Sequence, residues 1–195
     1  DLIIFAVKLW DTEAAARALG PMIGPQTRIL SLQNGIDSLA MIRPHVGEAK
    51  LRGGVIYVSA VIARPGVIRS PGGLHHIVCD APQDDPVMAA FCDAGRRATA
   101  LVIKPSEAIE TAIWEKFCAL ASLSGTTSLL RASMGQILGH PETRLLQRQL
   151  VDEVVAVGRA AGISLREELP DEIMAKLAAM PAAFRSSMSE DLERG

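Results

Sequence analysis

The sequence predicts two parts: an α/β part over residues 1–104, built on a doubly wound parallel sheet, and an all-helical part over residues 105–195. Three observations carry this prediction. Strand patterns alternate with helix patterns before Pro105, and only helix patterns follow it. Such alternation is typical of right-handed crossover units in a parallel sheet. Apolar residues make up 49% of the chain and aromatic residues 4%, which favours helix-rich or α/β architecture over an all-β sandwich.

The α/β part opens on a continuous apolar run, residues 2–7, with the length of a strand buried on both faces. Gly20-Pro21 ends the helix that follows, and Pro44 is expected to stop the next one. The expected strands are residues 2–7, 28–32, 55–62, 67–69, 74–78 and 101–104, and the expected helices are 12–19, 36–43 and 86–98.

A change of pattern lies between residues 53 and 80, where strand patterns follow one another without a helix. Gly53-Gly54, Pro65-Gly66 and Pro71-Gly72-Gly73 are interpreted as turns there. We therefore expect an antiparallel meander attached to the parallel sheet.

The all-helical part begins with a long helix in which apolar residues recur at spacings of three and four. Lys116 lies beside this apolar face, and Leu120 and Ser124 follow it at four and eight positions. This arrangement is expected to form one wall of a cleft, although a lysine in this position more often lies at a solvated rim with its stem on apolar neighbours. The expected helices are residues 106–130, 141–161, 170–180 and 184–193.

Two polar residues directly follow the first two strands of the predicted sheet. Lys8 follows the first strand, and Asn34 begins an Asn-Gly pair after the second. Ligands of doubly wound sheets bind at the carboxyl ends of the strands, so both residues are candidates for a ligand site. The alternatives are a plain tight turn at Asn34-Gly35 and a lysine that reaches solvent.

Composition argues against several classes of function. The net charge is −2 and the basic residues are scattered, which gives no electrostatic case for nucleic acid or anionic membrane. No run approaches the roughly 18 apolar residues of a membrane span. The three cysteines lack paired spacing and are expected to be reduced structural thiols in a cytoplasmic protein. His75 and His76 point to opposite faces of a strand, so no metal site is assigned.

Short motifs along nearly the whole chain, taken in order, resemble the ketopantoate reductase (2-dehydropantoate 2-reductase) family. They are Ala-Val-Lys at 6–8, Leu-Gln-Asn-Gly at 32–35, Gly53-Gly54 with Ser59-Ala60 and Pro65-Gly66, Ile113-Trp114-Glu115-Lys116, and Ser186-Ser187-Met188 with residues 191–195. The resemblance implies a Rossmann-like NADP-binding domain over residues 1–104. It also implies a helical domain of the 6-phosphogluconate dehydrogenase C-terminal type over residues 105–195.

The resemblance further implies an activity: NADPH-dependent reduction of a 2-keto acid to a 2-hydroxy acid, as in pantothenate biosynthesis. The family's glycine-rich loop for the cofactor would precede Asp1, and a cofactor-binding glutamate would follow Gly195, so we expect a chain truncated at both ends. Oligomeric state is open, with a homodimer through the helical domain as one option.

Site residues are also implied by the resemblance. Lys116 matches the catalytic lysine, which would protonate the ketone oxygen as hydride arrives. Asn34 matches an asparagine that touches cofactor ribose and substrate, Ala60 a backbone contact to the nicotinamide side, and Lys8 a lysine near the cofactor. Ser187 matches a serine that binds substrate.

The chain departs from the family at two substrate-binding positions. Leu120 and Ser124 stand where well-known members have asparagines, four and eight residues after the catalytic lysine. Leucine offers no hydrogen bond and serine reaches less far, so a less polar or differently shaped keto acid is expected. The alternatives are another 3-hydroxyacid or 6-phosphogluconate-type dehydrogenase and a non-catalytic NADP-binding protein.

Overall fold

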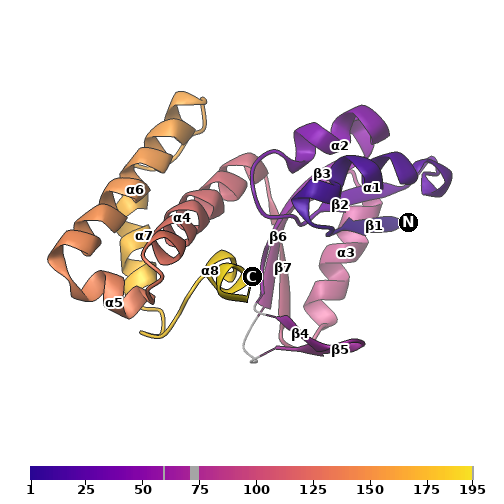
Figure 1. The fold of residues 1–195 in the computed structure, drawn as a ribbon. Helices are drawn as coiled ribbons and strands as arrows, with labels where there is room; N and C mark the ends of the chain where they lie inside the picture. The colour runs from indigo at the N-terminus through magenta and orange to yellow at the C-terminus, as the bar shows by residue number, and fades with distance from the viewer. Residues whose placement is uncertain (59, 71–74, 195) are drawn as a thin grey trace. The chain divides into compact units, whose positions relative to one another are not determined.

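The computed structural model describes residues 1–58, 60–70 and 75–194. It divides the chain into two compact units, Asp1–Ile113 and Trp114–Gly195, which we call the sheet unit and the helical unit (Figure 1). One helix, α4 (Ile109–Leu129), begins in the first unit and continues in the second. The predicted class, a mainly parallel sheet domain followed by helices, is confirmed. The domain boundary predicted at residues 104/105 stays a prediction.

The sheet unit contains a five-stranded sheet in the order β1-β2-β3-β6-β7. Pairing is parallel between β1, β2 and β3 and between β6 and β7, and antiparallel between β3 and β6. A separate hairpin is formed by β4 and β5. The strands are β1 (Leu2–Phe5), β2 (Arg28–Ser31), β3 (Leu51–Tyr57), β4 (Val61–Arg64), β5 (Val67–Arg69), β6 (His75–Asp80) and β7 (Leu101–Ser106).

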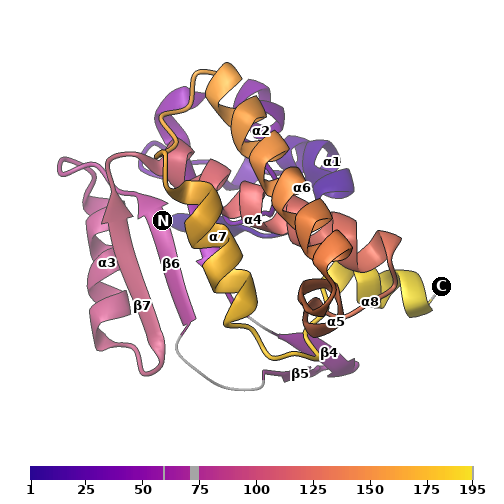
Figure 2. The same cartoon turned by 90° about the vertical axis from the view of Figure 1, so that its left-hand side faces the viewer.

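Helices cover both faces of this sheet, because successive strand residues point to opposite sides. Ile29 packs in a cluster with residues of α1 and α2, whereas its neighbour Leu30 packs in a second cluster with residues of α3. Figure 2 shows α3 alongside β7. The helices of this unit are α1 (Thr12–Ala18), α2 (Ser38–Val46) and α3 (Pro86–Arg97), with short 3-10 helices at Leu9–Asp11, Gly20–Met22 and Glu48–Lys50.

Four details of the predicted sheet unit are wrong. The strand expected over residues 2–7 and buried on both faces ends at Phe5, and its Ile4 is 45% exposed. The strand expected at residues 55–62 ends at Tyr57, and Val61–Arg64 form β4, which pairs with β5 in a separate hairpin rather than in a meander attached to the sheet.

Gly53 and Gly54 lie inside β3 rather than in a turn, and a Cβ on Gly54 would come 2.6 Å from a methyl of Leu32. These glycines allow neighbouring side chains to pack closely against the strand. Close packing and turns both favour glycine, so the sequence alone does not distinguish them. The helix expected to stop near Pro44 continues to Val46, where Gly47 ends it with a φ of 81°. Residues 71–74, assigned to a turn and a strand start, lie outside the described residues.

The helical unit contains the remainder of α4 and four further helices. Its buried side chains come from α4, α5, α6, α7 and α8, and α5, α6 and α7 pack on one another. Gly158 permits a close approach, since a Cβ there would lie 2.6 Å from Leu165 and 3.0 Å from the Trp114 ring. The helices are α5 (Met134–Gly139), α6 (Pro141–Ala160), α7 (Leu169–Ala178) and α8 (Ser187–Arg194). All but α5 match predicted helices.

The three cysteines are free and buried, as expected for structural thiols. Burial raises the pKa of Cys79 to about 12 and that of Cys118 to about 11, so neither thiol ionises readily at neutral pH. A cytoplasmic location stays a prediction. Within the described part of the chain, no helix combines the length and the apolar character needed to cross a membrane. The same residues contain no cluster of three His, Cys, Asp or Glu side chains suited to a metal.

Asp85 joins the amino-terminal edge of the sheet to α3. It is only 2% exposed, accepts hydrogen bonds from the backbone amides of Val87 and Met88, and pairs with Arg28 and Arg52 at 2.6 and 2.7 Å. Burial alone would raise the pKa of Asp85. Hydrogen bonds from Arg28, the Met88 amide and Arg52 outweigh that effect, so the pKa lies below its ordinary value.

Replacing Asp85 should therefore destabilise the sheet unit strongly. Asp85→Ala removes the carboxylate shared by two mostly buried guanidinium groups, of which Arg52 keeps an ion pair with Asp80 at 3.9 Å. It also removes the cap of α3, and together these losses should cost about 3–5 kcal/mol. Chemical denaturation of the variant measures this loss, with Asp84→Ala at the exposed neighbouring position as the matched control. Equal denaturation midpoints for the two variants would contradict the assignment.

Candidate active site

Two loops that carry predicted site residues lie together at one edge of the sheet. β1 and β2 are parallel, with Phe5 paired to Ser31, so the loops after them leave the sheet at the same edge. Gln33 fastens one loop to the other: its side-chain amide donates to the backbone oxygen of Val7 at 2.9 Å and to Thr12 Oγ1 at 2.7 Å. The structure therefore fixes the segment after β2 against the segment after β1.

Asn34 lies in the second loop, with its side chain exposed. The next residue, Gly35, has a φ of 98°, a conformation that favours glycine, and its α-carbon faces the side chain of Leu9. The chain bends at Asn34-Gly35. This bend leaves Asn34 at the carboxyl edge of the sheet, which is the position that the ligand interpretation requires.

Lys8 and Ala60 also follow parallel strands of the sheet. Lys8 is exposed, and its Nζ lies 5.7 Å from the centre of the Trp10 ring, which is 78% exposed. Ala60 is an exposed residue after β3, and β3 runs parallel to β2. The three residues predicted to bind the cofactor therefore follow three adjacent parallel strands. Ser59, quoted with Ala60 in the sequence motif, lies outside the described residues.

Lys116 lies on α4, two residues from each of the buried side chains Trp114 and Cys118. Its side chain is partly buried, and burial lowers its pKa from 10.5 to about 8. Burial has this effect because a charged ammonium loses hydration that the neutral amine does not need. At neutral pH the group is a protonated acid with a pKa close to the ambient value, which suits proton transfer.

Three of the four predicted substrate-binding residues belong to the same unit as Lys116, whereas the fourth, Asn34, belongs to the sheet unit. Leu120 and Ser124 are half-buried and follow Lys116 along one side of α4, one and about two turns on. Ser187 is the exposed first residue of α8. Its neighbour Ser186 contacts Thr127 of α4, with 2.7 Å between the two hydroxyl oxygens. The structure thus brings the start of α8 onto the helix that carries Lys116.

Gln33 and Thr127 are two residues whose roles no sequence pattern predicts. Gln33 lies within the Leu-Gln-Asn-Gly motif, but only its tertiary hydrogen bonds show that it joins two loops. Thr127 contacts a residue 59 positions away, and no local pattern reveals such a pairing.

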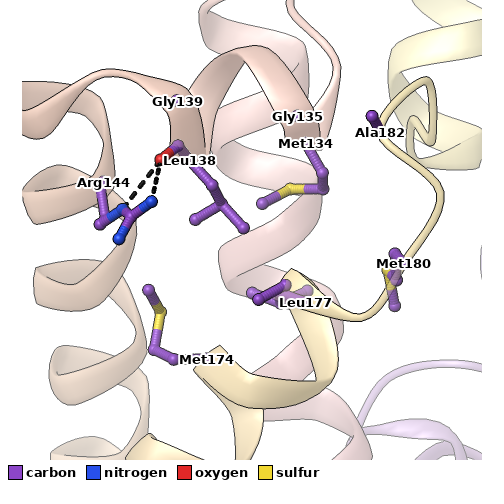
Figure 3. Close-up of a pocket in the computed structure, with 10 residues that line it drawn as sticks. Met134, Gly135, Leu138, Gly139, Arg144, Met174, Leu177, Met180 and Ala182 are labelled. Atoms are coloured by element: carbon purple, nitrogen blue, oxygen red, sulfur yellow. Dashed lines mark hydrogen bonds between the residues drawn. The ribbon is translucent and has the colours of Figure 1, made fainter.

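A pocket of about 410 Å³ lies within the helical unit and is lined by none of the predicted site residues. Figure 3 shows its mainly apolar wall of Met134, Leu138, Met174 and Leu177. Arg144 lies at the pocket and donates from Nε to the backbone oxygen of Leu138 at 2.8 Å. This bond satisfies a carbonyl in the last turn of α5, which is a sufficient structural role for the arginine.

Comparison with known proteins gives matches in both parts of the chain. Residues 1–81 match the family model described as ketopantoate reductase PanE/ApbA, and residues 108–195 match the model for the C-terminal part of the same family. The 2-dehydropantoate 2-reductase of Halobacterium salinarum is 30% identical over 200 residues, covering 100% of this chain and 64% of that protein.

Two solved structures are also similar. A PanE/ApbA family ketopantoate reductase from Ralstonia eutropha is 27% identical with a TM-score of 0.85, covering 100% of this chain and 63% of its own. The ketopantoate reductase of Staphylococcus aureus, described as dimeric, is 25% identical with a TM-score of 0.82, covering 100% and 64%. This chain therefore spans less than two thirds of the length of these relatives. Two matched family models, one for each part of the chain, show that it belongs to the ketopantoate reductase family.

Proposed function

We propose that the protein of which this chain is part reduces a 2-keto acid to the 2-hydroxy acid, with NADPH as hydride donor. The observation that carries the proposal is the partly buried Lys116, whose pKa of about 8 makes it a proton donor near neutral pH. Family membership supports the reaction type. The preference for NADPH over NADH is the family's expectation and part of the proposal.

The carboxyl edge of the sheet fits a nicotinamide dinucleotide. Lys8 offers an exposed ammonium suited to a phosphate, and Asn34 offers an amide suited to ribose hydroxyls. Ala60 offers backbone groups at the end of the third parallel strand. When bound, the cofactor supplies the hydride for the reduction.

Lys116 is proposed as the catalytic acid. Its ammonium hydrogen-bonds the ketone oxygen of the substrate and stabilises the negative charge that develops there. It then donates its proton to that oxygen, which gives the hydroxyl of the product and leaves a neutral amine. Partial burial assists both steps, because electrostatic interactions are stronger where water is excluded.

Substrate recognition is proposed to differ from that of well-known family members. Leu120 presents an apolar surface where those members have an asparagine, and the short Ser124 replaces a second one. Ser187 is proposed to hydrogen-bond the substrate. A keto acid with an apolar tail suits this combination better than ketopantoate, which carries a hydroxyl at its far end.

A homodimer through the helical unit is also proposed. Leu145 and Val157 of α6 are each 59% exposed, which leaves apolar surface for a partner. The relative from Staphylococcus aureus is described as dimeric. Light scattering of the full-length protein tests this assembly, and a monomer at micromolar concentration would contradict it.

Removing the proposed acid should abolish most of the activity without unfolding the protein. Lys116→Met should lower kcat for keto acid reduction by about 10²–10⁴-fold, the usual contribution of a positioned acid. The matched control is Lys176→Met, which removes an exposed lysine from α7 of the same unit. If keto acid-dependent NADPH oxidation is unchanged in Lys116→Met, the lysine has no part in the mechanism and a non-catalytic cofactor-binding role gains support.

The same substitution should not destabilise the helical unit at neutral pH. Because the folded-state pKa of Lys116 is about 8 against an unfolded value near 10.5, the charged form is disfavoured on folding. That cost is fully present below pH 8 and disappears as pH rises through the unfolded pKa. The melting temperature of Lys116→Met should therefore equal or exceed that of the wild type at pH 7, with a smaller difference at pH 10. A clear loss of stability at pH 7 would contradict this.

The pH dependence of turnover should follow the ionisation of Lys116. Reduction needs the protonated lysine, so kcat/KM should fall as pH rises through about 8 rather than through about 10.5. Oxidation of the hydroxy acid needs the neutral amine and should rise over the same interval. A pH profile for reduction that stays flat to pH 9.5 would rule out this assignment, as would an unchanged alkaline limb in Lys116→Met.

The wild-type protein should prefer trimethylpyruvate, in which a hydrogen replaces the hydroxyl of ketopantoate, over ketopantoate itself. Leu120→Asn should shift the ratio of the two kcat/KM values toward ketopantoate by about tenfold, the equivalent of one recovered hydrogen bond. Leu120→Ala is the control, since it makes room without adding a hydrogen-bonding group. Ketopantoate as the better substrate of the wild type would overturn the recognition proposal and leave the reaction type intact.

A further inference from the structure

Three buried hydroxyl residues connect α4 to the start of α8 within the helical unit. They are Thr127, Ser186 and Ser189, which we call the hydroxyl cluster. Thr127 Oγ1 lies 2.7 Å from Ser186 Oγ. Ser189 Oγ donates to the backbone oxygen of Thr127 at 3.1 Å, and the backbone amide of Ser189 donates to Ser186 Oγ at 3.1 Å.

The directions of these hydrogen bonds allow one consistent arrangement. Thr127 Oγ1 lies 2.7 Å from the backbone oxygen of Leu123, to which it donates its single proton. It must then accept from Ser186, whose own oxygen accepts from the amide of Ser189. Every hydroxyl proton in the cluster therefore has an acceptor. A fully satisfied buried network of this kind fixes its members in one geometry.

The cluster lies on the side of α4 that carries Lys116. Eleven residues, or three helical turns, separate Lys116 from Thr127, so the two side chains leave α4 in nearly the same direction, about 16 Å apart along the axis. Leu120 and Ser124 lie between them in sequence. Ser187 directly follows Ser186, and the cluster therefore determines where Ser187 stands relative to this side of α4.

We propose that the hydroxyl cluster is a positioning device for the reaction: it holds Ser187 at a fixed place along the helix that carries Lys116. The inference rests on the proposed function. Thr127, Ser186 and Ser189 are themselves buried, and they act on the substrate through Ser187. Their loss should weaken keto acid binding while leaving the acid chemistry of Lys116 unchanged.

The neighbouring residue Thr126 provides a matched control. It is also fully buried on α4 and also bonds back to its own helix, but its side chain contacts Gln147 of α6, at 2.6 Å, and takes no part in the cluster. Thr126→Val and Thr127→Val remove the same atom from adjacent buried positions of one helix. A merely structural role predicts similar effects from the two substitutions.

The test is steady-state kinetics on the full-length protein, with trimethylpyruvate and NADPH. Thr127→Val should raise KM for the keto acid about tenfold, as expected for one lost positioning hydrogen bond, with KM for NADPH and the alkaline pH midpoint unchanged. Thr127→Ser should restore KM to near the wild-type value. Thr126→Val should lower the melting temperature without changing KM for the keto acid. Ser186→Ala breaks the same bond from the other side and replaces Thr127→Val if the latter fails to fold.

The possible outcomes separate this inference from the proposed function. Wild-type turnover with an unchanged KM in Thr127→Val or Ser186→Ala overturns the positioning role alone. Equal rises in KM for Thr126→Val and Thr127→Val also overturn it, because the effect is then one of general stability. Absence of keto acid-dependent NADPH oxidation in the wild type overturns the proposed function and this inference with it.

Discussion

The parallel pairing of β1, β2 and β3 is the constraint on which the arrangement of the sheet unit depends. Because Phe5 pairs with Ser31, the loops carrying Lys8 and Asn34 leave the sheet together, and Ala60 follows the third parallel strand. Burial on both faces then fixes the register, since a slip of one residue would exchange Ile29 and Leu30 between the two apolar clusters.

The helical unit uses burial for a different purpose. Around α4, partial burial of Lys116 opposes folding at neutral pH but lowers the pKa of the lysine toward the ambient value. The hydroxyl cluster on the same helix has no such cost, because each of its buried protons has an acceptor. One helix thus combines a partly desolvated ionisable group with a satisfied polar network.

The sequence alone was sufficient for the parts of this structure that depend on local patterns. The periodic apolar residues of α4 predicted a long helix. The apolar run at residues 2–7 predicted a strand, but β1 covers only Leu2–Phe5 and its Ile4 is 45% exposed. Gly53-Gly54 was wrongly assigned to a turn. Glycine is favoured both in turns and where a missing side chain lets two segments pack closely, so the sequence signal is the same. The side chain of Leu32, which excludes a Cβ at Gly54, is distant in sequence and invisible to a local pattern.

The candidate site was predictable only in part, for a similar reason. Lys116 could be singled out through the resemblance to a family, whereas a periodic pattern favours a solvated lysine at the rim of the helix. Its lowered pKa depends on how neighbouring elements pack around it, and this information lies in tertiary structure. The contact between Thr127 and Ser186 joins positions 59 residues apart, and the Gln33 contact with Val7 joins positions 26 residues apart.

The proposed proton donor and the residues proposed to recognise the substrate are different residues of α4, and this separation has a chemical consequence. Every 2-keto acid has the same ketone oxygen next to a carboxylate, so a proton donor at Lys116 serves any of them equally well. The part of the substrate that varies lies beyond the carbonyl, and the residues proposed to meet it are Leu120 and Ser124. A change at these two positions alters which tail is accepted without altering the charge that develops at the oxygen. The proposed chemistry can therefore persist through a change of substrate, which is why a leucine at position 120 argues against ketopantoate but not against reduction.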